Sequence, residues 1–310
     1  VILPPPASLR VPTMSNDLVS LRSYFYLGQY DAIVKEAKTL GTLSGATETS
    51  RLAYLYRAHV VMGNHSLVAK EINKNSPTVL QVIQLHSTYL TSSEEQKAMA
   101  LEKLNEIVED GSMASDKTFP LIGAEMYLAA GKKKEALKLI YNGSTLDMMG
   151  LTIQILLGED RVDLAQQILK KMIQIEEDDT LTQLAGAWIN VVQGGNKVSE
   201  ALDTYQDLQE KFGSSIMLLN SIAVCQIKQA QYVEALSTLG AARDLALKSK
   251  TKISPDTYIN TMICLQHMRK APETIQRLSS DFEKNSPNHP WIVKQKEMLQ
   301  AIEKSKKTYK

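Results

Sequence analysis

Apolar residues recur three and four positions apart along most of the chain, and this spacing places them on one face of a helix. The clearest example is residues 218–242, where two such stretches flank a short polar turn at 228–231. Ala223 and Ala235 lie in the two stretches, and their small side chains allow antiparallel helices to approach closely. The pattern predicts two amphipathic helices that bury their apolar faces only against neighbouring copies of the same hairpin.

Copies of this hairpin follow one another along the chain. The turn glycines Gly28, Gly63 and Gly131 are separated by 35 and 68 residues. Small residues in the second helices are spaced by 29, 36 and 34 residues, and they are Ala136, Ala165, Ala201 and Ala235. A period near 34 with small residues at fixed points is typical of tetratricopeptide repeats. The sequence therefore predicts an all-α fold, a right-handed superhelical solenoid of helix hairpins.

Residues 77–110 follow this pattern less clearly. The turn expected near Lys97 has no glycine. The second helix is nevertheless well marked, because Ser92 and Glu95 have the spacing of a capping box and a periodic apolar pattern follows them. We therefore expect a hairpin here whose regularity the sequence does not fix.

The last apolar pattern predicts a C-terminal capping helix. It places Trp291, Met298, Leu299 and Ile302 on one face and lysines on the other. We count roughly eight hairpins before it, with no linker between them. This predicts three parts of the chain, which are a flexible leader at 1–15, one solenoid domain at 16–303 and a basic tail at 304–310.

Composition narrows the class of protein. The chain has 310 residues, of which 44% are hydrophobic, and its 35 Lys and Arg against 34 Asp and Glu leave a net charge of +1. It therefore has no overall basic field to attract nucleic acid or an acidic membrane. Cys225 and Cys264 fall within apolar helical patterns, which indicates buried free thiols and a reducing compartment. We find no signal peptide pattern, and the longest uncharged run, 75–93, is too polar to span a bilayer.

No catalytic or metal-binding motif emerges. The five histidines are scattered without ligand spacing, and the glycine turns at 131–134 and 194–197 lack the Walker pattern. The acidic run 176–179 is a candidate for metal or acid–base chemistry. A solvated loop whose last acids favour the N-terminus of the next helix is the simpler interpretation. We therefore expect no catalytic, cofactor-binding or metal-binding residues, no cofactor and no enzymatic activity.

Residues 151–157, 161–165 and 179–185, followed by Trp188, form a more specific pattern. Together they resemble the epsilon subunit family of coatomer. The similarity runs from about residue 16 to residue 302, which is nearly the whole chain. The resemblance implies a structural subunit of the COPI coat, which forms vesicles on Golgi membranes and carries cargo back to the endoplasmic reticulum and between Golgi cisternae.

The resemblance also implies partners and a location. Family members pair tightly with the C-terminal domain of the coatomer alpha subunit, and the repeats curl around part of it. The protein is then expected to be cytoplasmic, with membrane contact only through the assembled coat on Golgi membranes and vesicles. It is expected to need no cofactor and to bind no nucleic acid.

A solenoid of helix hairpins has a concave face formed by the first helix of each pair, which suits a peptide or a protruding loop. In tetratricopeptide proteins the concave positions lie three before and one after the small residue of that helix. Arginine and tyrosine at such positions are favoured interface anchors. We predict that the partner is bound through Leu18, Arg22, Phe25, Tyr26, Ala53, Arg57, Leu121, Glu125, Gly150, Gln154, Asn220 and Val224.

Other interpretations stay open. The aromatic residues Phe25 and Tyr26 equally suit packing of the first hairpin on the second. A tetratricopeptide adaptor or co-chaperone that captures acidic C-terminal peptides is a different class of binding protein. Of the side chains such a clamp uses, the concave face carries Arg22, Arg57 and Asn220, which makes the clamp incomplete.

Overall fold

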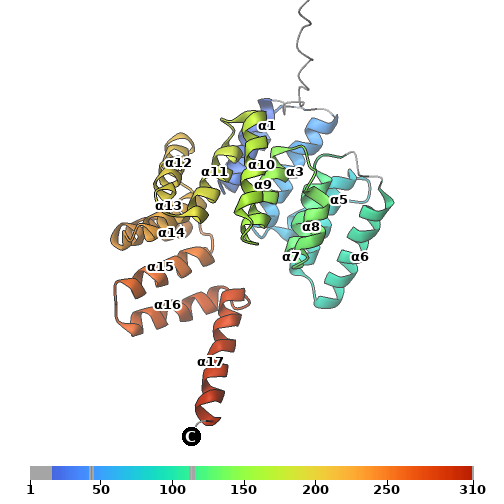
Figure 1. The fold of residues 1–310 in the computed structure, drawn as a ribbon. Coiled ribbons are helices and arrows are strands. Elements are labelled where there is room, and N and C mark those ends of the chain that lie inside the picture. The colour runs from blue at the N-terminus through green and yellow to red at the C-terminus, as the bar shows by residue number, and fades with distance from the viewer. Residues whose placement is uncertain (1–15, 42, 44, 112, 114–115, 309–310) are drawn as a thin grey trace, which may run out of the picture. The chain divides into compact units, whose positions relative to one another are not determined.

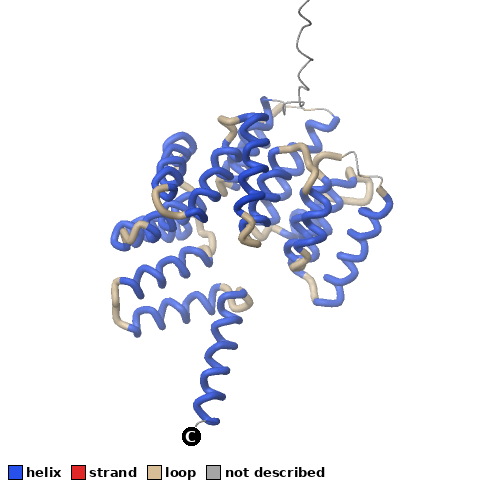
Figure 2. The backbone as a smooth tube through the Cα atoms, in the orientation of Figure 1, coloured by secondary structure: helices blue, strands red, loops and turns tan. Residues whose placement is uncertain are grey.

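The computed structural model describes residues 16–41, 43, 45–111, 113 and 116–308, and every regular element in these ranges is an α-helix (Figure 1). Seventeen helices are described, joined by short loops (Figure 2). Most successive helices pack against each other in pairs, which confirms the all-α fold of helix hairpins. The predicted leader lies outside the described residues.

The chain divides into two compact units, residues 1–193 and 194–310. The helices of the first unit are α1 (Asn16–Tyr26), α2 (Tyr30–Thr39), α3 (Gly45–Val61), α4 (His65–Glu71), α5 (Thr78–Thr91), α6 (Glu94–Asp110), α7 (Phe119–Ala129), α8 (Lys133–Ile140), α9 (Leu146–Leu157), α10 (Val162–Glu176) and α11 (Thr180–Gln193). Those of the second are α12 (Lys197–Phe212), α13 (Ile216–Lys228), α14 (Tyr232–Lys248), α15 (Pro255–His267), α16 (Pro272–Asn285) and α17 (Pro290–Thr308). One continuous domain over 16–303 stays a prediction.

Six pairs of successive helices are joined by a turn of the same backbone geometry. One residue of the turn adopts the left-handed conformation, and the N–H of the next residue donates to the carbonyl five positions earlier at 2.8–3.0 Å. This hydrogen bond ends the first helix of the pair in a Schellman motif. The left-handed residues are Gly28, Gly63, Gly131, Asp160, Ala230 and Arg269.

Only half of these six positions carry the glycine that the sequence pattern relies on. A side chain in the left-handed conformation costs about 1–2 kcal/mol per residue. At Ala230, with a φ of 60°, the packing of α13 against α14 imposes this conformation. The same turn therefore recurs where no glycine marks it.

Residues 77–110 form a regular pair, α5 and α6. Leu104 is fully buried and belongs to the same apolar core as Ile83. The expected capping box at Ser92 and Glu95 is wrong by one residue, because α6 begins at Glu94 and its N-cap, Ser93, makes no side-chain capping hydrogen bond. Both serines have Glu or Gln three residues later, so spacing alone does not select the one that begins the helix.

The core at the start of α17 centres on Phe282, which is fully buried. Its ring stacks on Tyr258 at 5.3 Å between centroids and lies 5.8 Å from Trp291. Trp291 and Ile292 attach the first turn of α17 to this core. The helix continues to Thr308, so residues 304–308 of the predicted basic tail are helical.

Replacing Ala230 by glycine is expected to stabilise the second unit by about 1 kcal/mol, because it removes the cost of a side chain at positive φ. Ala241 is exposed within α14, so Ala241→Gly is the matched control and is expected to destabilise by about 0.5–1 kcal/mol. Urea unfolding of both variants measures the two changes. If both glycines destabilise alike, the turn at Ala230 is not strained.

Candidate functional site

Six alternate helices of the first unit form a closed circuit. Each of α1, α3, α5, α7, α9 and α11 packs against the next, and α11 packs against α1 (Figure 1). We call these six the inner helices. Four of them, α1, α3, α7 and α9, carry residues that the sequence rule for a concave face selects, and the rule also selects residues on α13 of the second unit. The interior of the circuit contains a largely buried cluster of polar side chains, which we call the inner polar cluster. It consists of Arg22, Ser23, Tyr26, Tyr54, Arg57, Glu125, Asp147, Asp179 and Thr180.

The contact between α1 and α11 depends on a buried ion pair. The Arg22 guanidinium donates to the Asp179 carboxylate, and the two residues are only 5% and 4% exposed. Beside this pair, the hydroxyls of Ser23 and Thr180 are hydrogen-bonded at 3.0 Å. Asp179 also accepts the backbone N–H of Leu181 at 2.9 Å, so it caps α11 as well. One carboxylate thus fixes the start of α11 and its contact with α1.

Asp147 joins α9 to two other helices. Its carboxylate accepts a hydrogen bond from the hydroxyl of Tyr26 on α1 at 2.7 Å and from that of Tyr54 on α3 at 3.0 Å. Burial, and after it the nearby Asp147, raises the pKa of both tyrosines well above its usual range. Both hydroxyls therefore stay protonated and act as donors to a buried charge.

Arg57 on α3 forms the third polar contact. Its guanidinium donates to Glu125 on α7 and lies 4.1 Å from the ring centroid of Phe25, within the range of a cation–π interaction. The Arg57 side chain is 5% exposed, whereas that of Glu125 is 23% exposed. Burial lowers the pKa of His86, and the adjacent Glu125 opposes this change. Because the Glu125 side chain is partly exposed, the inner polar cluster reaches solvent at this residue.

Inside a protein, removing one partner of a buried ion pair is far more costly than at the surface. The uncompensated charge that remains costs roughly 3–5 kcal/mol, because it is shielded from water. Here two arginines and three carboxylates are each matched by a charged or hydrogen-bonding partner. The inner polar cluster therefore favours one arrangement of the five helices that contribute to it, α1, α3, α7, α9 and α11.

The structure brings five of the predicted contact residues together in the inner polar cluster or against it. These are Arg22, Phe25, Tyr26, Arg57 and Glu125. Phe25 also contacts Tyr30 and Tyr54 at 5.8 and 6.0 Å between ring centroids. Packing of the first hairpin on the second, which the sequence left open for the aromatic residues, is therefore present. Their contact with a partner stays a prediction.

The other predicted contact residues are dispersed. Leu18, Ala53 and Leu121 are buried core residues. Gly150 is also buried, and a side chain there would meet Leu181, so it allows α9 and α11 to approach closely. Gln154 is exposed on α9.

Two predicted residues lie in the second unit. Asn220 is buried, and its side-chain amide donates to the Thr257 hydroxyl at 2.9 Å. Val224 is half-buried. Neither belongs to the inner polar cluster, and their contact with a partner stays a prediction.

Sequence reasoning missed Ser23, Tyr54, Asp147 and Thr180, and it placed Asp179 in a solvated loop. The acidic run is in fact divided, because residues 176–178 are exposed and Asp179 is buried. The expectation that its last acid favours the next helix is confirmed by the cap on α11. In the sequence, Asp179 is an acid directly before an apolar helix. This pattern is the same for a buried N-cap residue and for an exposed one, so it does not predict burial.

Comparison with known proteins identifies the family. A family model described as the coatomer epsilon subunit matches residues 14–310. The chain is 33% identical to coatomer subunit epsilon-1 of Arabidopsis thaliana over 274 residues, which cover 88% of this chain and 90% of the relative. The chain belongs to the coatomer epsilon subunit family. It is also 31% identical to coatomer subunit epsilon of Dictyostelium discoideum over 304 residues, covering 94% and 99% of the two chains.

A solved structure supports the fold of this coatomer epsilon family member. A tetratricopeptide repeat protein from Parabacteroides merdae is similar with a TM-score of 0.56, over 86% of this chain and 97% of that one. The sequences are 11% identical, so the similarity shows the fold alone. It confirms the prediction of a tetratricopeptide-like fold.

Coatomer epsilon is a non-enzymatic coat subunit, and membership of its family confirms the expectation that the chain is not an enzyme. Among the described side chains, no three or more of His, Cys, Asp and Glu are grouped as metal ligands. None of the described helices has the length and apolar character needed to cross a membrane.

The Arg22–Asp179 pair predicts a non-additive loss of stability. Arg22→Met is expected to destabilise the protein by about 3–5 kcal/mol, because it leaves the buried Asp179 carboxylate without its cation. Asp179→Asn is expected to cost less, because the Glu176 carboxylate remains 3.8 Å from the Arg22 guanidinium. Asparagine retains the helix cap, so the second variant isolates the charge. The double variant is expected to lose less than the sum, as measured by urea unfolding.

The exposed pair of Arg161 and Asp163 provides the control for this cycle, because both side chains are more than half exposed. Asp163→Asn is expected to change the free energy of unfolding by little more than the error of the measurement. Strict additivity at Arg22 and Asp179 would contradict a coupled buried pair.

Tyr26 and Tyr54, whose hydroxyls are bound to Asp147, predict a loss of stability in alkali. Their pKa is raised in the folded protein, whereas the unfolded chain releases these protons near the usual value of about 10. The free energy of unfolding therefore falls as pH rises above about 10. The variant with both Tyr26→Phe and Tyr54→Phe is expected to show a shallower fall in urea unfolding between about pH 9 and pH 11. Equal slopes would argue against a folded-state shift.

Proposed function

We propose that this chain is a structural subunit of the COPI coat that binds and stabilises the C-terminal domain of the coatomer alpha subunit. The observation that carries the proposal is the match to the coatomer epsilon family over residues 14–310, which includes both units. In this role the protein acts in Golgi-to-endoplasmic reticulum and intra-Golgi vesicular transport. The proposed location is the cytoplasm, with contact to Golgi membranes and vesicles through the assembled coat.

The inner helices of the first unit supply the proposed contact surface. Much of their interior is already occupied by the paired side chains of the inner polar cluster. On α7 and α9 respectively, Glu125 is half-buried and Gln154 is exposed, so both offer polar groups to another chain. We place the alpha-subunit contact at these accessible positions rather than at Arg22.

An adaptor for acidic C-terminal peptides receives less support. Such a clamp needs accessible cationic side chains that receive carboxylates from the peptide. Arg22 and Arg57 are buried, and each is paired with a carboxylate of this chain. A peptide carboxylate would have to displace Asp179 or Glu125 to reach them.

Co-expression with the C-terminal domain of a coatomer alpha subunit tests the proposed function. We expect the two chains to elute from a sizing column as one stoichiometric complex that persists at high salt, because an enclosed interface with few exposed charges is weakly screened. Separate elution of two folded chains would overturn the proposed partner.

A matched pair of variants tests the proposed contact position. Gln154→Lys introduces a charge on α9 and is expected to accelerate dissociation of the alpha-subunit domain at least several-fold. Gln166→Lys makes the same change at an exposed position of α10 and is expected to leave dissociation unchanged. Equal dissociation rates for both variants would exclude Gln154 from the interface while leaving the partner itself in place.

A further inference from the structure

The second unit carries an exposed apolar stripe on α17. Met298, Leu299 and Ile302 are 59%, 55% and 50% exposed, although the same helix begins against the core around Phe282. Met298 and Ile302 are four residues apart and therefore lie on one face of the helix, and Leu299 adjoins them. Contiguous apolar residues on a surface mark a site of interaction more often than scattered ones do. We call these three residues the α17 stripe.

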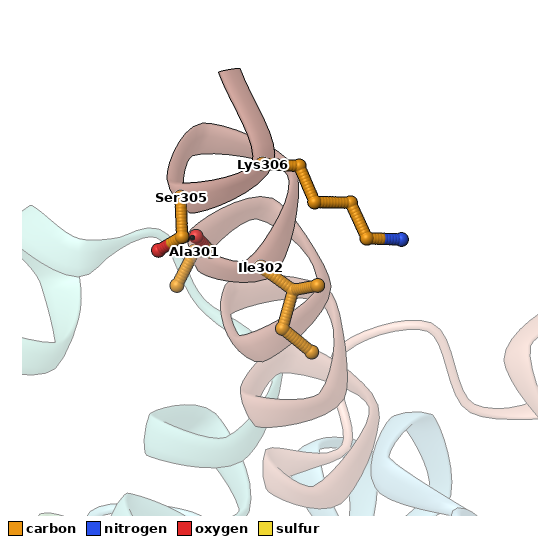
Figure 3. Close-up of a pocket in the computed structure, with 4 residues that line it drawn as sticks. All are labelled: Ala301, Ile302, Ser305 and Lys306. Carbon is orange, nitrogen blue, oxygen red and sulfur yellow. Dashed lines mark hydrogen bonds between the residues drawn. The ribbon is translucent and has the colours of Figure 1, made fainter. Parts of the chain in front are cut away.

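A shallow pocket adjoins the α17 stripe. It is lined by Ala301, Ile302, Ser305 and Lys306. Figure 3 shows Ile302 and Lys306 on one side of the helix and the short side chains of Ala301 and Ser305 on the other. The short side chains leave room beside Ile302 for a side chain inserted from another helix, as knobs enter holes in coiled coils.

Lysines border the stripe along the helix. Lys294 lies one turn before Met298 and Lys306 one turn after Ile302, and both lysines are exposed. Lys296 is bound to Glu283 of α16 at 2.5 Å, so its charge is matched within the chain. Over its whole length α17 carries five lysines and two glutamates. Lysines therefore outnumber acids around the α17 stripe, and the nearest acids are Glu297 beside Met298 and Glu303 one turn after Leu299.

The width of the stripe favours a helix as its occupant. Gln295 and Ser305 occupy the same face one turn before Met298 and one turn after Ala301, so the apolar surface is a narrow seam about two turns long. A membrane-inserted helix needs a broad apolar face with bulky side chains along its length. Two copies of α17 placed side by side bring like charges together. A narrow seam bordered by lysines instead fits a helix with apolar residues at heptad spacing and acidic residues beside them.

We propose that the α17 stripe is a docking surface for an acidic amphipathic helix of a partner protein. The stripe provides the apolar contact, the pocket accepts one inserted side chain, and Lys294 and Lys306 pair with the acidic flanks of the bound helix. This surface belongs to the second unit and is independent of the contact proposed on the inner helices of the first.

A labelled synthetic helix probes this surface on the full-length chain. The probe has about three heptads with leucines at the seam positions and glutamates flanking them, whose repulsion disfavours self-association. A second peptide of the same length has lysines at the flanking positions. Fluorescence anisotropy is expected to show binding of the glutamate peptide at least tenfold tighter than that of the lysine peptide.

Substitutions locate the binding. Met298→Glu combined with Ile302→Glu is expected to weaken binding of the glutamate peptide at least tenfold, because it places charge within the apolar seam. Val233 on α14 is 64% exposed, and Val233→Glu is the matched control that leaves binding unchanged. Lys294→Glu combined with Lys306→Glu is expected to reverse the preference towards the lysine peptide.

Several results would overturn the proposal. These are absence of binding, equal binding of both peptides, or loss of binding in Val233→Glu as well. Two other occupants are tested in parallel. Sedimentation of vesicles of phosphatidylcholine and phosphatidylserine that depends on Met298 and Ile302, without peptide binding, assigns the stripe to a membrane surface. Concentration-dependent dimerisation abolished by the same substitutions assigns it to a second copy of the chain.

Discussion

The first unit depends on a buried contact between residues that lie 157 positions apart in the chain, Arg22 and Asp179. Repeat proteins are usually stabilised by contacts between neighbouring repeats, so their stability is nearly a sum along one dimension. Here α1 also packs against α11, and Asp147 on α9 receives hydrogen bonds from α1 and α3. The inner helices therefore form one closed body in which the loss of α1 affects α9 and α11 directly. Such long-range contacts carry a cost in loop closure that a linear array avoids.

The sequence allowed the hairpins to be predicted because their determinants are local. Apolar spacing locates each helix, and turn glycines such as Gly63 mark the left-handed residue of the turn. Where the left-handed residue of the turn is Ala230 or Arg269, the residue type does not indicate a turn. Only the spacing of the apolar residues in the two helices predicts it. The first residue of α6 could not be predicted from local sequence, because two adjacent serines satisfy the same capping rule.

Closure of the first unit was not predictable in the same way. The repeat rule selects residues on four of the inner helices and on α13, since that face recurs with the repeat period. Periodicity identifies a face but does not tell whether another chain or the protein itself fills it. Arg57 was selected as an accessible anchor, yet Glu125 and Phe25 of the same chain surround it. Its partner on α7 lies 68 positions away, and no local pattern links the two.

The inner polar cluster and the α17 stripe differ in how their side chains are satisfied. In the cluster, buried charges are satisfied within the chain, which favours one arrangement of helices over others. Along the stripe, apolar side chains remain in contact with water although Trp291 and Ile292 of the same helix are packed against Phe282. Burial of Met298 and Ile302 against another helix would gain free energy without breaking any contact of the folded chain, whereas access to Arg22 would first require a buried ion pair to separate. The physical cost of binding therefore favours exposed apolar residues and partly solvated acids such as Glu125 over the buried arginines as sites of assembly.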